Sequence, residues 1–124
     1  MAAFDFVLLY VRRPADSETF YADLLGRPAI ESSPTFAMFS LGGGAMLGLW
    51  GRDGVQPPPT LGDGAGHGEP AMTVADDAAV RELHADWSAR GLTIAQAPTA
   101  MDFGFTFVAL DPDGHRLRGF APAS

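Results

Sequence analysis

The pattern of apolar and polar residues divides the first half of the chain into one long strand, one helix and three short strands. Residues 4–11 are rich in aromatic and branched side chains, which is typical of a buried strand. A helix is predicted next, because Asp16 or Ser17 can cap its start and Gly26 and Pro28 can end it. Shorter apolar runs then predict three strands, at residues 29–32, 35–41 and 45–51.

The second half repeats this order. A strand is predicted at residues 69–74 and a helix at about 78–90, where Val80, Leu83 and Trp87 share one face that we expect to pack into the core. Three further strands are predicted, at residues 93–97, 105–110 and 116–120.

The segment between the two halves, residues 53–67, is rich in Gly and Pro and suits an extended connector. The order βαβββ therefore occurs twice, in modules of about residues 1–52 and 68–124. We expect a single α+β domain that spans residues 1–124.

Composition and charge exclude several kinds of partner. The chain has 15 acidic and 8 basic residues, a net charge of −7, so that nucleic acid and anionic membrane surfaces are not expected as partners. It has no Cys, which removes disulfides, thiolate nucleophiles and cysteine metal sites. No apolar run approaches the ~20 residues that span a bilayer, and we expect a cytoplasmic protein.

Several short motifs accompany the two modules: Leu9-Tyr10-Val11, Phe20-Tyr21, Leu24-Leu25-Gly26, the Gly turn before Met46, and Asp111-Pro112-Asp113-Gly114-His115-Arg116. Together, the modules and the motifs resemble the vicinal oxygen chelate superfamily of glyoxalases, bleomycin-resistance proteins and dioxygenases. The likeness covers nearly the whole chain and implies a curved mixed sheet around a cavity, with chains paired as homodimers.

A narrower likeness is to resistance proteins that bind and sequester phenazine antibiotics. It rests on the segments 47–50 (LGLW), 101–107 (MDFGFTF) and 117–118 (LR). This resemblance implies that the ligand is a flat aromatic small molecule.

The superfamily's metal-dependent members take ligands from four strand positions, which the resemblance places here at Phe6, Gly48, Glu69 and Arg118. Only Glu69 offers an oxygen to a divalent cation. No metal, no cofactor and no catalytic residue are therefore expected. An alternative is a lyase, isomerase or dioxygenase that uses Glu69 as a base and recruits a metal through His67.

Strand alternation places a group of apolar and charged side chains on the cavity face. Aromatic rings stack on flat ligands, Arg118 can pair with a ligand carboxylate, and Gly48 is expected to leave room. Phe107 and Phe120 fall on the same predicted face, where we expect them to fill the interior. A module that binds no small ligand is a third possibility. The predicted ligand-binding residues are Phe6, Tyr10, Met46, Gly48, Trp50, Glu69, Phe103, Phe105 and Arg118.

Overall fold

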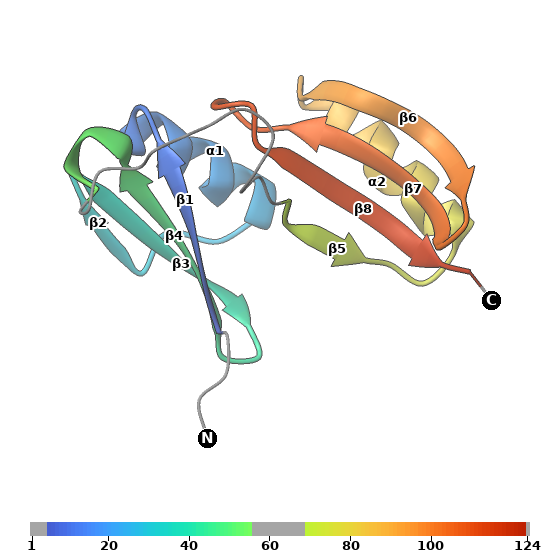
Figure 1. The fold of residues 1–124 in the computed structure, drawn as a ribbon, viewed down its shortest axis with the longest axis horizontal. Helices are drawn as coiled ribbons and strands as arrows, with labels where there is room; N and C mark the ends of the chain where they lie inside the picture. Colours follow the sequence, from blue (N-terminus) through green and yellow to red (C-terminus); the bar gives the residue numbers. More distant parts are fainter. Residues whose placement is uncertain (1–4, 56–68, 124) are drawn as a thin grey trace. The chain divides into compact units, whose positions relative to one another are not determined.

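The computed structural model describes residues 5–55 and 69–123 and divides into two compact units, Met1–Asp63 and Gly64–Ser124. Each unit holds one helix and one four-stranded mixed sheet, in the order βαβββ (Figure 1). The predicted α+β class and the repeat of modules are confirmed. The boundary between the units falls within the predicted connector 53–67, most of which lies outside the described residues.

The sheet of the first unit has the strand order β1-β4-β3-β2. β1 and β4 run parallel, whereas β4, β3 and β2 pair antiparallel. A short 3₁₀ turn follows the last strand. The elements are β1 (Phe6–Val11), α1 (Pro14–Leu25), β2 (Glu31–Ser33), β3 (Phe36–Gly42), β4 (Ala45–Gly51) and η1 (Arg52–Gly54).

Helix α1 begins two residues earlier than its predicted caps. Pro14 occupies the first helical turn directly after Arg13, where its missing N–H costs no hydrogen bond. The prediction that Asp16 or Ser17 caps the helix is wrong, because both lie inside it. The predicted end is correct, since Gly26 adopts a left-handed conformation (φ 67°) and donates its N–H to Ala22.

The core of the first unit lies on one face of its sheet, the face that α1 covers. Tyr21 of α1 is 2% exposed and its neighbours on the strands are equally buried. Apart from Gly48, which is buried, residues of the opposite parity on β1, β3 and β4 remain partly or largely exposed, and we call this the open face. The α1 face is buried along the middle of β3 and β4, whereas Val7 of β1 is 45% exposed there. The buried strand residues on the α1 face are Val11, Ala37, Phe39, Leu47 and Leu49.

The sheet of the second unit has the corresponding order β5-β8-β7-β6, with β5 and β8 parallel. Helix α2 is capped by Asp76, whose carboxylate accepts a hydrogen bond from the N–H of Ala79 at 2.9 Å. The elements are β5 (Ala71–Thr73), α2 (Asp77–Ala89), β6 (Thr93–Met101), β7 (Gly104–Leu110) and β8 (Arg116–Pro122).

Strand β6 is longer than the predicted strand at 93–97, which stopped before Pro98. The register between β6 and β7 shifts between Gln96 and Thr99, so that Pro98 lies in an irregular part of an edge strand. A residue without an N–H is tolerated there. The first strand of the unit is shorter than predicted, because Glu69 and Pro70 precede it.

The core of the second unit forms where α2 packs on β7 and β8. The Phe107 ring lies 5.3 Å from the Trp87 ring and 5.4 Å from the His84 ring, both edge to face. Trp87 is 2% exposed, as predicted for a core residue. Gly119 is required beside Phe107, because a Cβ at this position would lie 2.6 Å from Phe107 Cε1.

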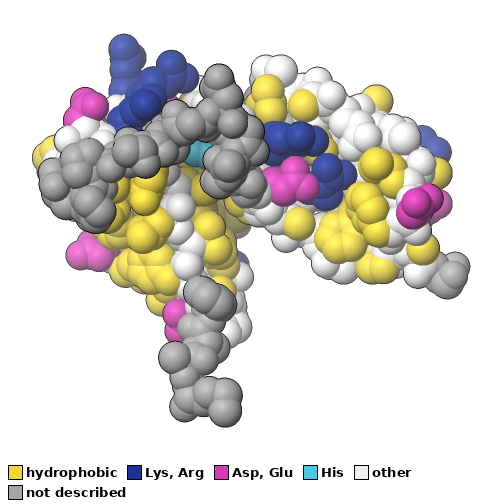
Figure 2. Space-filling model, viewed as in Figure 1, with side chains coloured by type: hydrophobic (Ala, Val, Ile, Leu, Met, Phe, Trp, Pro, Cys, Tyr) yellow, Lys and Arg dark blue, Asp and Glu magenta, His cyan; other side chains and the backbone are white. Residues whose placement is uncertain are grey.

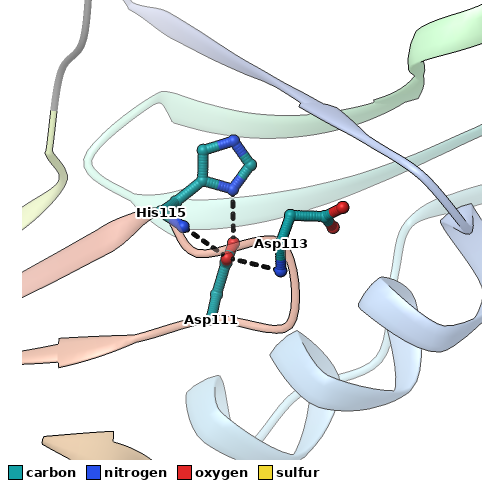
Figure 3. A group of neighbouring side chains, drawn as sticks. All are labelled: Asp111, Asp113 and His115. Carbon is teal, nitrogen blue, oxygen red and sulfur yellow. Dashed lines mark hydrogen bonds and ion pairs between the residues drawn. The ribbon is translucent and has the colours of Figure 1, made fainter.

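The turn between β7 and β8 is built around the buried side chain of Asp111. Its Oδ1 accepts hydrogen bonds from the N–H groups of Asp113 (2.9 Å) and His115 (2.8 Å), and its Oδ2 lies 2.7 Å from His115 Nδ1 (Figure 3). This hydrogen bond raises the pKa of His115, more than burial lowers it. These contacts give Asp111 a structural role in the turn.

Removing a side chain from the sealed face of the first sheet should cost far more stability than removing one from the open face. Leu49 is fully buried, whereas Leu8 on the neighbouring strand is 45% exposed. Leu49→Ala should lower the free energy of unfolding by about 2–5 kcal/mol, and Leu8→Ala by roughly 1 kcal/mol or less. Urea unfolding measures both, and equal losses would contradict the two-faced sheet.

The Asp111–His115 pair should make stability depend on pH. Because the folded state raises the pKa of His115, the stabilisation is complete below the unfolded pKa near 6.5 and is lost as pH rises through the folded value. Urea unfolding of the wild type and His115→Gln should show a stability difference that shrinks between pH 5.5 and 8.5. A constant difference across that range would show that the ion pair contributes nothing.

Candidate ligand-binding site

The open face of the first sheet gathers most of the site residues predicted in that unit. Parallel pairing aligns Phe6 with Met46 and Tyr10 with Trp50, which places all four on one side. Phe6 is 43% exposed and Tyr10 is 38% exposed. Figure 2 shows apolar side chains gathered over this sheet. We call this surface the aromatic face; it comprises Phe6, Leu8, Tyr10, Phe36, Met38, Met46, Gly48 and Trp50.

Three members of the aromatic face were not predicted. Leu8 pairs with Gly48 on β4, and from β3 Met38 also pairs with Gly48 while Phe36 pairs with Trp50. The alternation within 4–11 and 35–41 contains the signal that would have found them, since each shares the parity of a predicted site residue or pairs with one.

The expectation that Gly48 leaves room for a ligand is wrong. A Cβ at this position would lie 2.7 Å from both Leu8 Cδ2 and Phe6 Cε1, and 3.1 Å from Phe36 Cζ. Neighbouring side chains therefore already occupy the space above Gly48. Because Gly48 has no side chain, those of Phe6, Leu8 and Phe36 can lie close to the sheet and cover its backbone.

Trp50, one of the predicted ligand-binding residues, is partly exposed. The Tyr10 ring meets it edge to face, with centroids 6.5 Å apart and planes at 82°. Such a contact fixes the orientation of the indole, and a ring held in this way can stack on a flat ligand with little loss of freedom.

The second sheet separates residues that the sequence placed together. Phe105 was expected on the face of Arg118, and so was Phe107, but β7 pairs these two with Ala121 and Gly119, whereas Arg118 pairs with Val108. The Phe105 ring lies under Arg81 of α2, with Arg81 Cζ 4.7 Å from its centroid. Phe105 and Phe107 therefore face the helix, and the predicted position of Phe105 on the open face is wrong.

Phe103 does lie on the face of Arg118. It sits in the turn between β6 and β7, is 45% exposed, and its ring centroid is 5.6 Å from Arg118 Cζ. The ring of Phe120, which shares this face, lies 6.1 Å from that of Phe103 and is only partly exposed. Of the predicted ligand-binding residues Phe103 and Phe105, only Phe103 therefore lies on the face of Arg118.

Arg118 and Glu69 form the charged centre of this face. Arg118 Nε donates to Glu69 Oε1 at 2.6 Å, and Arg116 Nε lies 3.4 Å from Glu69 Oε2. Arg118 Nη1 donates to Thr106 Oγ1 (3.1 Å) and to Gln96 Oε1 (3.5 Å). We call Arg116, Arg118 and Glu69 the arginine cluster.

Sequence reasoning missed Arg116, Thr106 and Gln96. Arg116 is two residues before Arg118 on one strand, so alternation along that strand places both on the same face. Thr106 joins them because the pairing of β7 with β8 puts it opposite Phe120, on the face of Arg118. Gln96 comes from the irregular part of β6, where alternation gives no guide.

The four positions that would hold a metal in this fold do not fit one. Phe6 and Gly48 carry no donor atom, and Arg118 is a cation. Both carboxylate oxygens of Glu69 contact arginines, which compete with any metal ion for the same oxygens. His67, the other residue of the alternative metal site, lies outside the described residues.

A second group of possible metal ligands consists of Asp111, Asp113 and His115, whose donor atoms lie within 4.8 Å of one another. The Asp111 carboxylate is already bonded within the turn, and in Figure 3 the carboxylate of Asp113 points away from it. These three residues therefore stabilise the turn between β7 and β8.

No helix in the described part of the chain is long and apolar enough to cross a membrane.

Comparison with known proteins agrees with this architecture. Residues 3–118 match the family model of the glyoxalase/bleomycin resistance protein/dioxygenase superfamily. A protein of Agrobacterium tumefaciens, solved by solution NMR, is 48% identical with a TM-score of 0.88, and each chain is covered over 100% of its length. No curated protein gave a significant match.

More distant structures share the fold. A glyoxalase/bleomycin resistance protein/dioxygenase family enzyme from Burkholderia phytofirmans is 23% identical with a TM-score of 0.79, covering 98% of this chain and 100% of its own. A lactoylglutathione lyase from Agrobacterium tumefaciens is 19% identical with a TM-score of 0.76, covering 98% and 94%. Because the matched range runs from before β1 into β8, the chain belongs to the glyoxalase/bleomycin resistance protein/dioxygenase superfamily.

Proposed function

We propose that this protein binds and sequesters a flat aromatic small molecule, without a metal and without chemical conversion. An antibiotic is the natural candidate for such a ligand, which would make this a resistance-type protein. The aromatic face is the observation that carries the proposal. Its three β1 side chains are 38–45% exposed although large and apolar, and β4, with which β1 pairs, carries Met46 and Trp50 on the same side. Exposed apolar surface of this kind marks a binding site.

The charged residues of the second unit favour binding over metal-dependent catalysis. A metal-dependent lyase, isomerase or dioxygenase needs several oxygen or nitrogen donors around one ion. Here the one carboxylate at a ligand position is held by two guanidinium groups. The same pairing disfavours Glu69 as a general base, because both of its carboxylate oxygens are already engaged by guanidinium groups.

The likeness to phenazine-binding resistance proteins supports a planar, fused-ring ligand. Trp50 in the segment 47–50 and Phe103 in the segment 101–107 both expose ring surface, and Arg118 in 117–118 offers a cation. Stacking and a guanidinium group together suit an aromatic ring system that bears a polar substituent.

Trp50→Ala should weaken the binding of a planar aromatic such as phenazine-1-carboxylic acid by about 1–3 kcal/mol, because stacking area is lost. Calorimetric titration measures this loss without relying on the removed fluorophore. In the wild type, saturable quenching should report on Trp50, since Trp87 is 2% exposed. Phe105→Leu, on the helix side of the second sheet, is the control and should leave affinity unchanged. Full affinity in Trp50→Ala would refute stacking on the aromatic face.

We also propose that the chains pair as a homodimer, as is usual in the superfamily. Large exposed apolar side chains on an otherwise folded unit support pairing. Sedimentation equilibrium should give twice the chain mass of 13.1 kDa at micromolar concentration. A mass that stays at one chain over that range would exclude the dimer.

A further inference from the structure

We propose that Arg116, Arg118 and Phe103 form a subsite for the acidic group of an aromatic ligand, and that Glu69 sets the charge preference of this subsite. The inference rests on the proposed function, because it assumes a flat aromatic ligand and names its chemical class. The ligand is an aromatic anion, and Glu69 is the built-in carboxylate that competes with it for the two guanidinium groups.

The charges of the arginine cluster do not cancel. Two guanidinium groups face one carboxylate, which leaves one positive charge in excess. Glu69 engages the Nε atom of each arginine, and Arg118 Nη1 is used by Thr106 and Gln96. Among the described residues, Arg118 Nη2 and both Nη atoms of Arg116 have no partner. These donors can bind a second carboxylate.

Arg118 is held rigidly before any ligand arrives. Its side chain is 15% exposed, and Thr106, which accepts a hydrogen bond from it, is fully buried. The Thr106 hydroxyl donates to the carbonyl of Gly119 at 2.9 Å, so its oxygen is oriented to accept from Arg118. A guanidinium fixed in this way loses little conformational freedom on binding.

Phe103 supplies a flat apolar surface beside the cation. Its ring is 45% exposed, and the edge-to-face contact with Phe120 fixes its orientation. A planar ligand can stack on this ring while its acidic group reaches the guanidinium 5.6 Å away. A neutral ligand gains the stacking but cannot use the excess charge.

The net charge of −7 does not override this local preference. Charges farther apart than the Debye length, about 8 Å at physiological ionic strength, are largely screened, whereas a contact pair is not. The acidic surface therefore slows the approach of an anion, and the arginine cluster decides how tightly it is held.

A matched pair of ligands tests the inference: phenazine-1-carboxylic acid and the neutral phenazine-1-carboxamide. Both are titrated calorimetrically at pH 7.5, where the carboxylic acid (pKa about 4) is ionised. The wild type should bind the carboxylate about tenfold more tightly. Arg116→Gln, at a side chain that is 55% exposed, should abolish that preference by weakening the binding of the carboxylate more than that of the carboxamide. Glu69→Gln should raise carboxylate affinity about tenfold, because both Nε donors become available.

Arg81→Gln is the matched control, since this arginine lies on the helix side of the same sheet over Phe105 and should not alter the preference. Equal binding of the two ligands by the wild type would overturn the acidic subsite and leave the proposed function standing. If neither ligand binds, both the subsite and the proposed aromatic function fail. A carboxylate affinity that falls in Glu69→Gln would show that Glu69 organises the arginines rather than competing for them, and would overturn its assigned role.

Discussion

Within residues 5–55 and 69–123, each sheet packs against one helix, and one helix can cover only one face of a sheet. In the first unit α1 buries Leu49 and Phe39, and in the second α2 buries Phe107. The opposite faces carry the aromatic face in the first unit and the arginine cluster in the second. Because strand residues alternate between faces, the register that turns one set of side chains toward the helix turns the other set toward the opposite face.

The two open faces differ in chemistry although the units share an element order. That of the first unit is apolar, with Tyr10 and Trp50 in edge-to-face contact and Gly48 covered by its neighbours. That of the second is organised by a buried-to-exposed chain of hydrogen bonds, from Gly119 through Thr106 and Arg118 to Glu69. At the strand positions where the resemblance places metal ligands, this protein has the hydrophobic contacts of Phe6 and Gly48 and the ion pair of Glu69 with Arg118.

The replacement of a metal by an arginine has a consequence for Glu69. A carboxylate beside a metal is a ligand, and one beside an apolar wall is a candidate base, but between two guanidinium groups it is a counter-ion. Its oxygens are 2.6 and 3.4 Å from Arg118 and Arg116. The structure thus shows Glu69 as the partner of two arginines.

The sequence by itself determined the elements, the repeated module, the family resemblance and the loss of three metal donors, because these depend on local periodicity and residue identity. It also placed Phe6, Tyr10, Met46 and Trp50 on one face. Only the tertiary structure decided that Phe105 faces α2, that the space over Gly48 is filled, and that Arg116 joins Arg118 at Glu69. A one-residue difference in register exchanges the two faces of a strand, and long side chains find partners from distant segments, so neither outcome is encoded in any local pattern.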